Sequence, residues 1–484
     1  MRAYLATPIG VACTAALVLP LSLPSGAAAL PAGSTAVALA SASAAVPAVP
    51  GSTQSIPLTA LPADRSPGAA QEQGVTRRDV RPFSLLGVVW DDADTEFHGT
   101  VQVRTRSAGT QIWSEWQDLE THNQEHGADP GSQERDSGTV HGSTAPLWVG
   151  GSDGVELRVR ATQEQDETGP ARALLPQGLR LELIDPGVEP AVGSGAEQSG
   201  AGQTETGASP ADPATGSGLG PLAPMSPEEL ASSAANEELV APGAREIPAT
   251  TEVSPGTFSA TFSATYSESA AGSASGSSAE AQRYAAPRPR IITRRGWGAD
   301  ESLRERNFRY TGTVKAAFVH HSATGNNYTC DEAPSVLRSI YRYHVRSSGW
   351  RDFGYNFAVD KCGNIYEGRA GGVAKPVLGA HTLGFNTNST GIAVLGTYSN
   401  TNPPAAALTA LARLTAWKLG LHGVNPNGKV TLTSGGSGKY GKGTRVTLHT
   451  ISGHRDGFAT ECPGARLYGK LGTVRAKAAG YQGR

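Results

Sequence analysis

The stretch Ala316-Ala317-Phe318-Val319-His320-His321 decides the fold of the C-terminal part of this 484-residue chain. Four apolar residues follow one another without interruption and end at two histidines. Similar runs occupy residues 354–359 and 391–395. Near-continuous apolar runs of this length are typical of strands that are buried on both faces of a sheet. The pattern therefore predicts a central sheet in the C-terminal part.

Helices are predicted between these strands. One begins near Pro334, because proline is favoured in the first turn, and another ends at Gly420. The apolar residues that share one face of each helix are Val336, Leu337, Ile340, Tyr341 and His344 in the first, and Leu408, Leu411, Leu414 and Trp417 in the second. We therefore expect residues 286–484 to form an α/β domain with a central mixed sheet flanked by helices.

Residues 80–187 have a different texture. Apolar and polar residues alternate in short runs such as 101–106 and 155–160, and Gly, Asp and Ser clusters separate the runs. Alternation with frequent turns predicts an all-β, sandwich-like domain. Four of the seven tryptophans lie here, and we expect them to fill a small core rather than form a sugar-stacking surface. This domain is expected to be an accessory module, with wall attachment as one possible role.

The remaining segments are rich in Ala, Pro, Ser, Thr and Gly and contain few aromatic residues. Such composition cannot bury enough apolar surface to offset the entropy of ordering. We expect residues 30–79 to be disordered and residues 188–285 to be a flexible linker. Residues 1–29 resemble an export signal, with Arg2, an apolar run over 9–23 and a small-residue cleavage pattern that ends at Ala29. No other run approaches the roughly 20 apolar residues of a membrane span, so a secreted, extracellular or wall-associated protein is predicted.

Charge is distributed unequally along the chain. Residues 80–187 carry 8 Lys or Arg and 18 Asp or Glu, a balance of −10, whereas residues 286–484 carry 27 and 10, a balance of +17. The basic C-terminal domain favours an anionic partner, such as an acidic wall polymer or a nucleic acid. It also allows the acidic β domain to be its electrostatic partner. A nucleic-acid binder is disfavoured because aromatic residues are not interleaved with the basic ones and no recognition helix is evident.

Three cysteines remain once the export signal is removed: Cys330, Cys362 and Cys462. An odd number in an oxidising compartment leaves one thiol to be explained. A bridge between the two nearest, Cys330 and Cys362, would close a loop and leave Cys462 free.

Metal-binding side chains lie at the ends of predicted strands. His320 and His321 end one strand, and His454 precedes Cys462 by eight positions. Two imidazoles and a thiolate suit zinc, and three protein ligands leave the fourth position open, as in catalytic sites. Neighbouring side chains on a strand point to opposite faces, so only one of His320 and His321 should reach the metal. A glycine-rich stretch at 436–441 partly matches nucleotide-binding patterns, but its flanks predict a surface hairpin loop.

Six blocks of sequence resemble the peptidoglycan recognition protein family, which is similar to zinc-dependent N-acetylmuramoyl-L-alanine amidases of the phage lysozyme type. The likeness covers about residues 290–475. The blocks are Phe318-Val319-His320-His321-Ser322-Ala323, Gly349-Trp350-x-Asp352-x-Gly354-Tyr355-Asn356-Phe357, Tyr366-Glu367-Gly368-Arg369, Gly379-Ala380-His381, Gly384-Phe385-Asn386, and Ser452-Gly453-His454-Arg455-Asp456 with Cys462-Pro463.

The resemblance implies specific roles for individual residues. By matching position to position, His320, His454 and Cys462 are the zinc ligands, and His321 is not a ligand. Tyr355 takes the place of the catalytic tyrosine, and Thr460 stands at a position that is lysine in the phage enzymes. Relatives without amidase activity replace the cysteine ligand by serine, so Cys462 favours an enzyme.

The same resemblance places Arg369, His381 and Asn386 along the substrate groove. Arg369 would offer its fork to a stem-peptide carboxylate; the alternative is a structural salt bridge with Glu367 or Asp352. The predicted function is zinc-dependent hydrolysis of the amide between N-acetylmuramic acid and L-alanine, and the alternative is a non-catalytic peptidoglycan-binding module. The expected partner is peptidoglycan, with anionic wall polymers as further candidates, no nucleic acid, no membrane span and a monomeric state.

Overall fold

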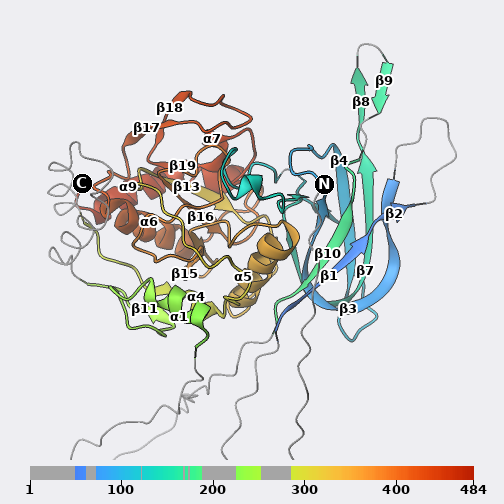
Figure 1. Ribbon diagram of the computed structural model, residues 1–484, viewed down its shortest axis with the longest axis horizontal. Coiled ribbons are helices and arrows are strands. Elements are labelled where there is room, and N and C mark those ends of the chain that lie inside the picture. Colours follow the sequence, from blue (N-terminus) through green and yellow to red (C-terminus); the bar gives the residue numbers. More distant parts are fainter. Residues whose placement is uncertain are drawn as a thin grey trace, which may run out of the picture. The chain divides into compact units, whose positions relative to one another are not determined.

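The structure is a computed structural model that describes residues 50–61, 72–121, 123–166, 169–172, 175–187, 225–251 and 285–484, with the backbone alone for 163–172 (Figure 1). The export signal predicted for 1–29 lies outside the described residues, as does most of the predicted linker. The elements of the N-terminal domain are β1 (Ser52–Pro57), β2 (Thr59–Ala60), β3 (Glu72–Trp90), β4 (Gly99–Ser107), β5 (Gln117–Leu119), the 3₁₀ turn η1 (Arg135–Ser137), β6 (Gly142–Ser143), β7 (Leu147–Ala161), β8 (Gln163–Asp166), β9 (Gly169–Arg172) and β10 (Arg180–Asp185).

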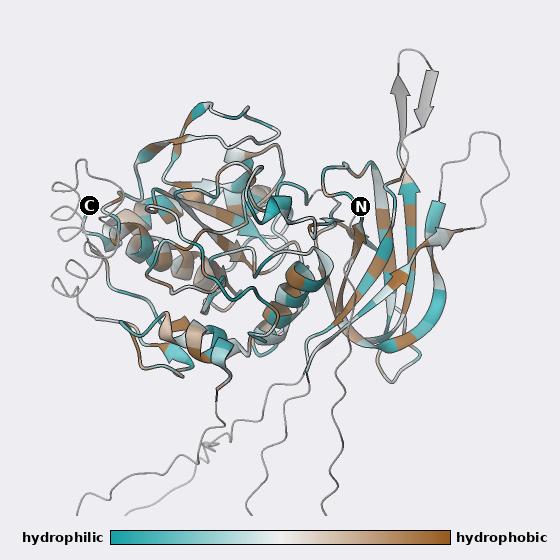
Figure 2. Ribbon diagram, viewed as in Figure 1, coloured by the Kyte–Doolittle hydropathy of each residue, from teal (hydrophilic) through white to brown (hydrophobic). Residues whose placement is uncertain are grey.

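The N-terminal domain is built on one antiparallel sheet. Its strand order is β1-β10-β3-β7-β4-β5, and β2 and β6 also pair with β3. Side chains along β4 alternate between the core and solvent, and Figure 2 shows this alternation along the strands. The long strand β3 shifts register against β7 at three places, and such irregularities bend a strand. Because Val75 and Leu86 from both halves of β3 join one core, the sheet curls around its own apolar side chains.

The boundaries of this domain differ from the sequence prediction. β1, β2 and the start of β3 lie within residues 50–79, which composition predicts to be disordered. β1 is held by pairing with β10 along six residues, and most of its side chains are half-buried or exposed. Backbone pairing at a sheet edge needs few apolar side chains, so composition does not reveal it.

Core filling by tryptophan is confirmed for Trp90, which is 0% exposed in the core of this domain. Trp148 is buried in the core shared with the C-terminal domain. Trp113 and Trp116 are half-buried and lie under the guanidinium groups of Arg77 and Arg158, so the expectation is wrong for them.

The C-terminal domain has the predicted mixed sheet flanked by helices. The strand order is β11-β12-β15-β14-β16-β13-β19, and β13, β14, β16 and β19 run parallel to one another. The elements are α1 (Pro227–Ala234), β11 (Glu246–Ile247), β12 (Ile291–Ile292), α4 (Arg294–Trp297), β13 (Ala316–His321), α5 (Ala333–Arg342), the π-helical turn η2 (Tyr343–Ser347), β14 (Phe357–Val359), β15 (Ile365–Glu367), β16 (Ser389–Val394), α6 (Ala405–Gly420), β17 (Lys429–Thr433), β18 (Arg445–His449), β19 (Ile451–Gly453), α7 (His454–Gly457), α8 (Ala465–Tyr468) and α9 (Leu471–Tyr481).

Helices cover both faces of the sheet. α6 and α9 pack against one another and supply side chains to the core on one face. α5 supplies Val336, Leu337 and Ile340 to a second core, which also includes Leu85 and Trp148 of the β domain. α5 therefore packs against strands of both domains, since it also contacts β3 and β10.

Part of the predicted linker joins the C-terminal domain. α1 begins at a capping box in which the Ser226 hydroxyl accepts a hydrogen bond from the Glu229 N–H, with Pro227 in the first turn. β11 pairs with β12 as the edge strand of the mixed sheet. The predicted flexible linker over 188–285 is thus interrupted by an ordered segment at 225–251.

The structure also tests the predictions for the glycine-rich stretch and for the cysteines. Residues 434–444 connect β17 to β18 in an antiparallel pair, so the glycine-rich stretch is a hairpin loop. Cys330 and Cys362 form a disulfide, and Cys462 is free and buried. Within the described ranges, no helix is long and apolar enough to cross a membrane.

Candidate metal centre and groove

The centre forms where the parallel strands β13 and β19 end. Val319 is the register partner of Gly453, so the residues that follow, His320 and His454, leave the sheet at the same edge. His454 is the first residue of α7, and Cys462 follows in the next loop. Chain segments 134 residues apart thereby bring two imidazoles side by side.

Distances between the three predicted ligands suit one metal ion. His320 Nδ1 lies 3.1 Å from His454 Nδ1 and 3.7 Å from Cys462 Sγ. Ligands at ordinary zinc bond lengths in a tetrahedron are about 3.3–3.6 Å apart. The structure therefore brings together all three residues that the sequence picked out.

A fourth residue, His126, joins this group. One donor atom from each of His126, His320, His454 and Cys462 lies within 4.8 Å of the others. His126 Nε2 is 4.0 Å from Cys462 Sγ, and its ring centroid is 4.5 Å from that of His454. His126 comes from the loop between β5 and β6 in the β domain. Sequence reasoning missed it, although His122-Asn123-Gln124-Glu125-His126 has the His-x-x-Glu-His spacing of one class of metallopeptidase, and this is the signal that could have found it.

The donor set fits zinc. All four side chains are buried, with His320 and His454 at 0% exposure. Burial and neighbouring imidazoles hold the pKa of His320 and His454 well below the usual value, and burial lowers that of His126 to about 3. Neutral imidazoles are the form that binds metal. Burial raises the pKa of the Cys462 thiol, so a thiolate here requires a cation beside it.

The second nitrogen of two of these rings lies on the other side of the ring. His126 Nδ1 and His454 Nε2 are buried and have no hydrogen-bond partner among the residues that the structure describes. The nitrogens that approach the other members of the group are His126 Nε2 and His454 Nδ1.

Behind the ligands lies a second layer of polar groups. The Thr382 hydroxyl is 3.3 Å from His320 Nε2 and 3.0 Å from His381 Nδ1. Asn386 Oδ1 accepts hydrogen bonds from the N–H groups of His381 and Thr382. His381 and Asn386 are 0% and 1% exposed. In this structure the two predicted substrate-binding residues therefore support the metal centre from behind.

Tyr355 lies beside the candidate ligands His320 and His126. Its ring centroid is 5.2 Å from that of His320 and 5.9 Å from that of His126. Burial, together with the charges of Cys462 and Glu125, raises the pKa of the Tyr355 phenol well above its usual value. The phenol is therefore protonated at neutral pH and can donate a hydrogen bond.

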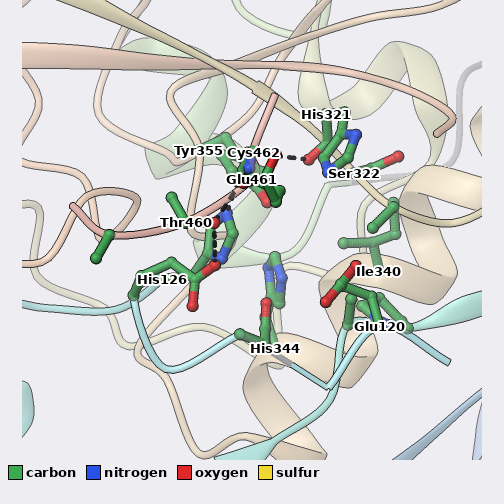
Figure 3. Close-up of a pocket in the computed structure, with 16 residues that line it drawn as sticks. Glu120, His126, His321, Ser322, Ile340, His344, Tyr355, Thr460, Glu461 and Cys462 are labelled. Carbon is green, nitrogen blue, oxygen red and sulfur yellow. Dashed lines mark hydrogen bonds between the residues drawn. The ribbon is translucent and has the colours of Figure 1, made fainter. Parts of the chain in front are cut away.

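A cavity of about 210 Å³ opens next to Tyr355 and Cys462 (Figure 3). Thr460 lines it, and its hydroxyl donates a 2.7 Å hydrogen bond to Glu125 Oε1 while accepting one from the Cys462 N–H. Six lining residues belong to the β domain: Glu120, Asn123, Glu125, His126, Ala145 and Pro146. Ligand sites usually measure about 300–1,000 Å³, so this cavity is small for a glycan with its peptide.

Arg369 has a different partner from those that the sequence suggested. Its guanidinium donates to both carboxylate oxygens of Glu134, at 2.9 Å each. Asp352 instead pairs with Arg294, and Glu367 accepts a hydrogen bond from the Asn236 amide. The alternative interpretation, a salt bridge of Arg369 with Asp352 or Glu367, is therefore wrong about the partner, which is Glu134 of the β domain.

His321 and His344 have structural contacts. His321 lies outside the four-residue group, and its Nδ1 accepts a hydrogen bond from the Tyr398 N–H. His344 is buried, stacks on Trp350 and accepts a hydrogen bond from the Gly354 N–H. Both side chains also line the cavity.

Comparison with known proteins agrees with this geometry. The family profile described as N-acetylmuramoyl-L-alanine amidase matches residues 310–465. Peptidoglycan-recognition protein SC2 of Drosophila melanogaster is 30% identical over 185 residues, which are 38% of this chain and 85% of that protein. Peptidoglycan recognition protein 1 of Bos taurus is 31% identical over 179 residues, which are 37% and 80%. The chain belongs to the peptidoglycan recognition and type 2 amidase family.

Two solved structures are also similar in sequence to this chain. Drosophila PGRP-LB is 26% identical, with 37% of this chain and 91% of that chain covered and a TM-score of 0.30. Peptidoglycan recognition protein LE in complex with tracheal cytotoxin is 29% identical, with 38% and 92% covered and a TM-score of 0.31.

The two domains of this peptidoglycan recognition and amidase family protein have separate matches. Residues 40–176 match a profile described as Rv3811 N-terminal galactose-binding domain-like. His320, His454 and Cys462 lie within the amidase match, whereas His126 lies within the other. The fourth member of the metal-binding group is thus contributed from outside the amidase domain.

Proposed function

We propose that this protein is a zinc-dependent N-acetylmuramoyl-L-alanine amidase that cleaves the bond between N-acetylmuramic acid and L-alanine in peptidoglycan. The observation that carries the proposal is the convergence of His320, His454 and Cys462, with one donor atom each, at the edge of the sheet beside Tyr355. Membership of the family supports peptidoglycan as the partner.

The chemistry that zinc supplies when bound is Lewis acidity, which polarises the amide carbonyl and acidifies water. The protonated Tyr355 phenol would donate a hydrogen bond to the carbonyl oxygen as negative charge develops on it, an effect worth about 3 kcal/mol for one donor. The Thr460 hydroxyl, which contacts Glu125 and the Cys462 N–H, is positioned to hydrogen-bond a group in the cavity. Thr382 fixes the orientation of the His320 ring.

The second candidate function is a peptidoglycan-binding module without catalysis. His126 favours it, because a centre with four protein ligands has the closed form of a structural zinc site. The two candidates differ in their products, since a binding module leaves the bond between glycan and peptide intact.

The test combines metal analysis with product analysis. The purified full chain is loaded with zinc, freed of excess metal and incubated with purified wall fragments. We expect one zinc per chain and, by mass spectrometry, stem peptides with a free N-terminal L-alanine, released faster by His126→Ala, which has three protein ligands, than by the wild type. Cys462→Ser serves as the control for contaminating hydrolases. Stoichiometric zinc with no free peptide from either the wild type or His126→Ala would favour the binding module.

Export and wall association belong to the same proposal. The export signal predicted over residues 1–29 would direct the protein out of the cell, where it would act as a monomer on peptidoglycan and contact anionic wall polymers through its basic domain. Mass determination of the secreted protein tests the signal, and we expect the mature chain to begin after Ala29. Light scattering tests the monomeric state.

A further inference from the structure

We propose that residues 123–139 of the β domain, the covering segment, close the metal centre and the substrate groove, so that the enzyme is held inactive by its own N-terminal domain. In this closed state His126 is the fourth zinc ligand. Glu134 and Asp129 bind Arg369 and Asn386, the side chains that would otherwise bind substrate. The inference rests on the proposed function and adds its regulation.

The metal centre carries the first part of the argument. With His126 beside His320, His454 and Cys462, four protein side chains can surround the ion. Zinc in protein sites is almost always four-coordinate, and catalytic centres reserve one position for water or substrate. Occupation of that position by His126 Nε2 would leave none for the reacting amide. His126 is 8% exposed, so its side chain is buried within the centre.

The groove carries the second part. Arg369 is the residue whose fork suits a stem-peptide carboxylate, and the Glu134 carboxylate fills that fork with two 2.9 Å hydrogen bonds. The Asn386 amide donates to the Gly127 carbonyl oxygen and to Asp129 Oδ1, at 2.8 and 2.6 Å. Asp129 Oδ1 also accepts from the Gly384 N–H. The covering segment therefore presents carboxylates and a carbonyl where a peptide would present the same groups.

The covering segment is fixed at both ends. Toward its start, the Leu383 N–H donates to the Glu125 carbonyl oxygen at 2.9 Å. At its end, the Thr139 hydroxyl donates to the Gly349 carbonyl oxygen at 3.0 Å. Gly349 has a φ of +74°, and a Cβ there would lie 1.7 Å from the Thr139 carbonyl oxygen, so only glycine allows this close approach.

The body of the β domain is docked as well. Leu85, Trp148 and residues of α5 share one apolar core, and the Tyr343 hydroxyl donates to the Thr144 carbonyl oxygen at 3.1 Å. The charge balances of −10 for residues 80–187 and +17 for residues 286–484 also attract one another. Opening must overcome these contacts, so peptidoglycan binds with an affinity reduced by the small open fraction.

The first test measures whether a position on the bound metal is open, and it does not depend on catalytic turnover. The full chain is loaded with cobalt(II) in place of zinc, and azide is titrated while the visible absorption bands are followed. In the wild type we expect no azide response, because no position is open. In His126→Ala we expect azide to shift the bands, and His98→Ala serves as the matched control, since His98 is a half-exposed histidine of the same domain. An equal azide response in the wild type and His126→Ala would overturn the closed centre.

The second test measures whether Glu134 reduces the affinity of the groove for a muropeptide. In the Cys462→Ser background, which prevents cleavage, we compare the affinity for a soluble muropeptide with and without Glu134→Gln. Glutamine keeps the size of the side chain but weakens its grip on Arg369, so we expect binding to tighten by at least tenfold. Unchanged or weaker binding by the correctly folded variant, as judged by circular dichroism, would overturn the covering of the groove.

The two proposals fail in different ways. If neither the wild type nor His126→Ala binds cobalt or zinc, the zinc amidase itself is wrong. If both bind metal and both respond to azide, the amidase stands and only the closed state is wrong.

Discussion

Arg369 and Glu134, 235 residues apart in sequence, form a two-point ion pair in which both side chains are less than 10% exposed. Burial raises the pKa of Glu134, but attraction to Arg369 and hydrogen bonds from Arg369 and Arg351 outweigh it, and the pKa lies below its usual value. Removing one partner of a buried pair leaves an uncompensated charge and typically costs about 3–5 kcal/mol. Loss of either partner alone would therefore destabilise the contact between the β domain and the amidase domain.

Cys462→Ser should weaken zinc binding and, in the His126→Ala background in which the centre is open, abolish amide cleavage. Three imidazoles remain, and three histidines can hold zinc by themselves. We therefore expect zinc affinity to decrease from the wild type to Cys462→Ser and further to the double variant Cys462→Ser/His126→Ala, as measured by competition with a chromogenic chelator. Full turnover by the double variant would refute the ligand assignment.

Tyr355→Phe should slow catalysis without loss of zinc. The phenol is protonated and lies beside His320, and loss of one such donor lowers kcat by about 10²–10³-fold. The measurement is kcat on a soluble muropeptide, made in the His126→Ala background so that the centre is open. A change in zinc content, with kcat per zinc unchanged, would show that Tyr355 acts on the metal site instead.

Thr382→Val should weaken zinc binding although Thr382 is not a ligand. Valine keeps the shape but removes the hydroxyl 3.3 Å from His320 Nε2. Loss of such a partner usually costs about 10–100-fold in metal affinity. Thr382→Ser restores the hydroxyl and should recover most of the affinity. Equal affinity in the valine and serine variants would contradict the positioning role.

Stability should fall as the pH rises because of Glu367. Burial raises the pKa of this carboxyl to about 7, above its value in the unfolded chain. The Glu367 carboxyl therefore makes its full contribution to the free energy of unfolding below about pH 4.5. This contribution, about 3 kcal/mol, is lost as the pH rises to about 7. Urea unfolding at pH 5 and pH 8 measures it, and Glu367→Gln should show a smaller loss between the two. The same loss in both proteins would assign the effect to other groups.

Gly87→Ala should loosen the docking of the two domains. A Cβ at this position in β3 would lie 2.3 Å from the Tyr343 hydroxyl oxygen, and overpacking of this kind costs about 1–3 kcal/mol. We expect faster amide hydrogen exchange in residues 123–139. A Cβ would also lie 2.5 Å from Cζ and 2.7 Å from Cε2 of the Tyr343 ring, so the control is Tyr343→Phe by itself, which loses only the hydroxyl and should exchange more slowly than Gly87→Ala. Unaltered exchange in Gly87→Ala would show that this contact does not hold the covering segment.

Patterns along the chain predicted what depends on local sequence. The strand before His320 and the helix that contains Leu411 and Leu414 could be predicted, because buried apolar residues recur at a regular spacing along the sequence. The trio of His320, His454 and Cys462 could be found because its chemistry is unusual and its blocks resemble a family. Glu134 could not be found in this way, because it acts through a contact between two folded surfaces and its partner Arg369 is not marked in the sequence around it. His126 has His122 four positions before it, a metal-ligand spacing, but nothing in the sequence places this pair beside His320.

The pairing of strand β11 also indicates where the chain can accept an insertion. Because β11 pairs with β12, and the Thr250 N–H donates to the Arg288 carbonyl oxygen at 2.9 Å, the stretch 252–284 starts and finishes at the same sheet edge. Doubling the length of such a closed excursion costs only about 0.6 kcal/mol in chain entropy. Insertions there would leave the C-terminal domain intact, which makes this stretch a natural point for grafting a reporter or an additional module.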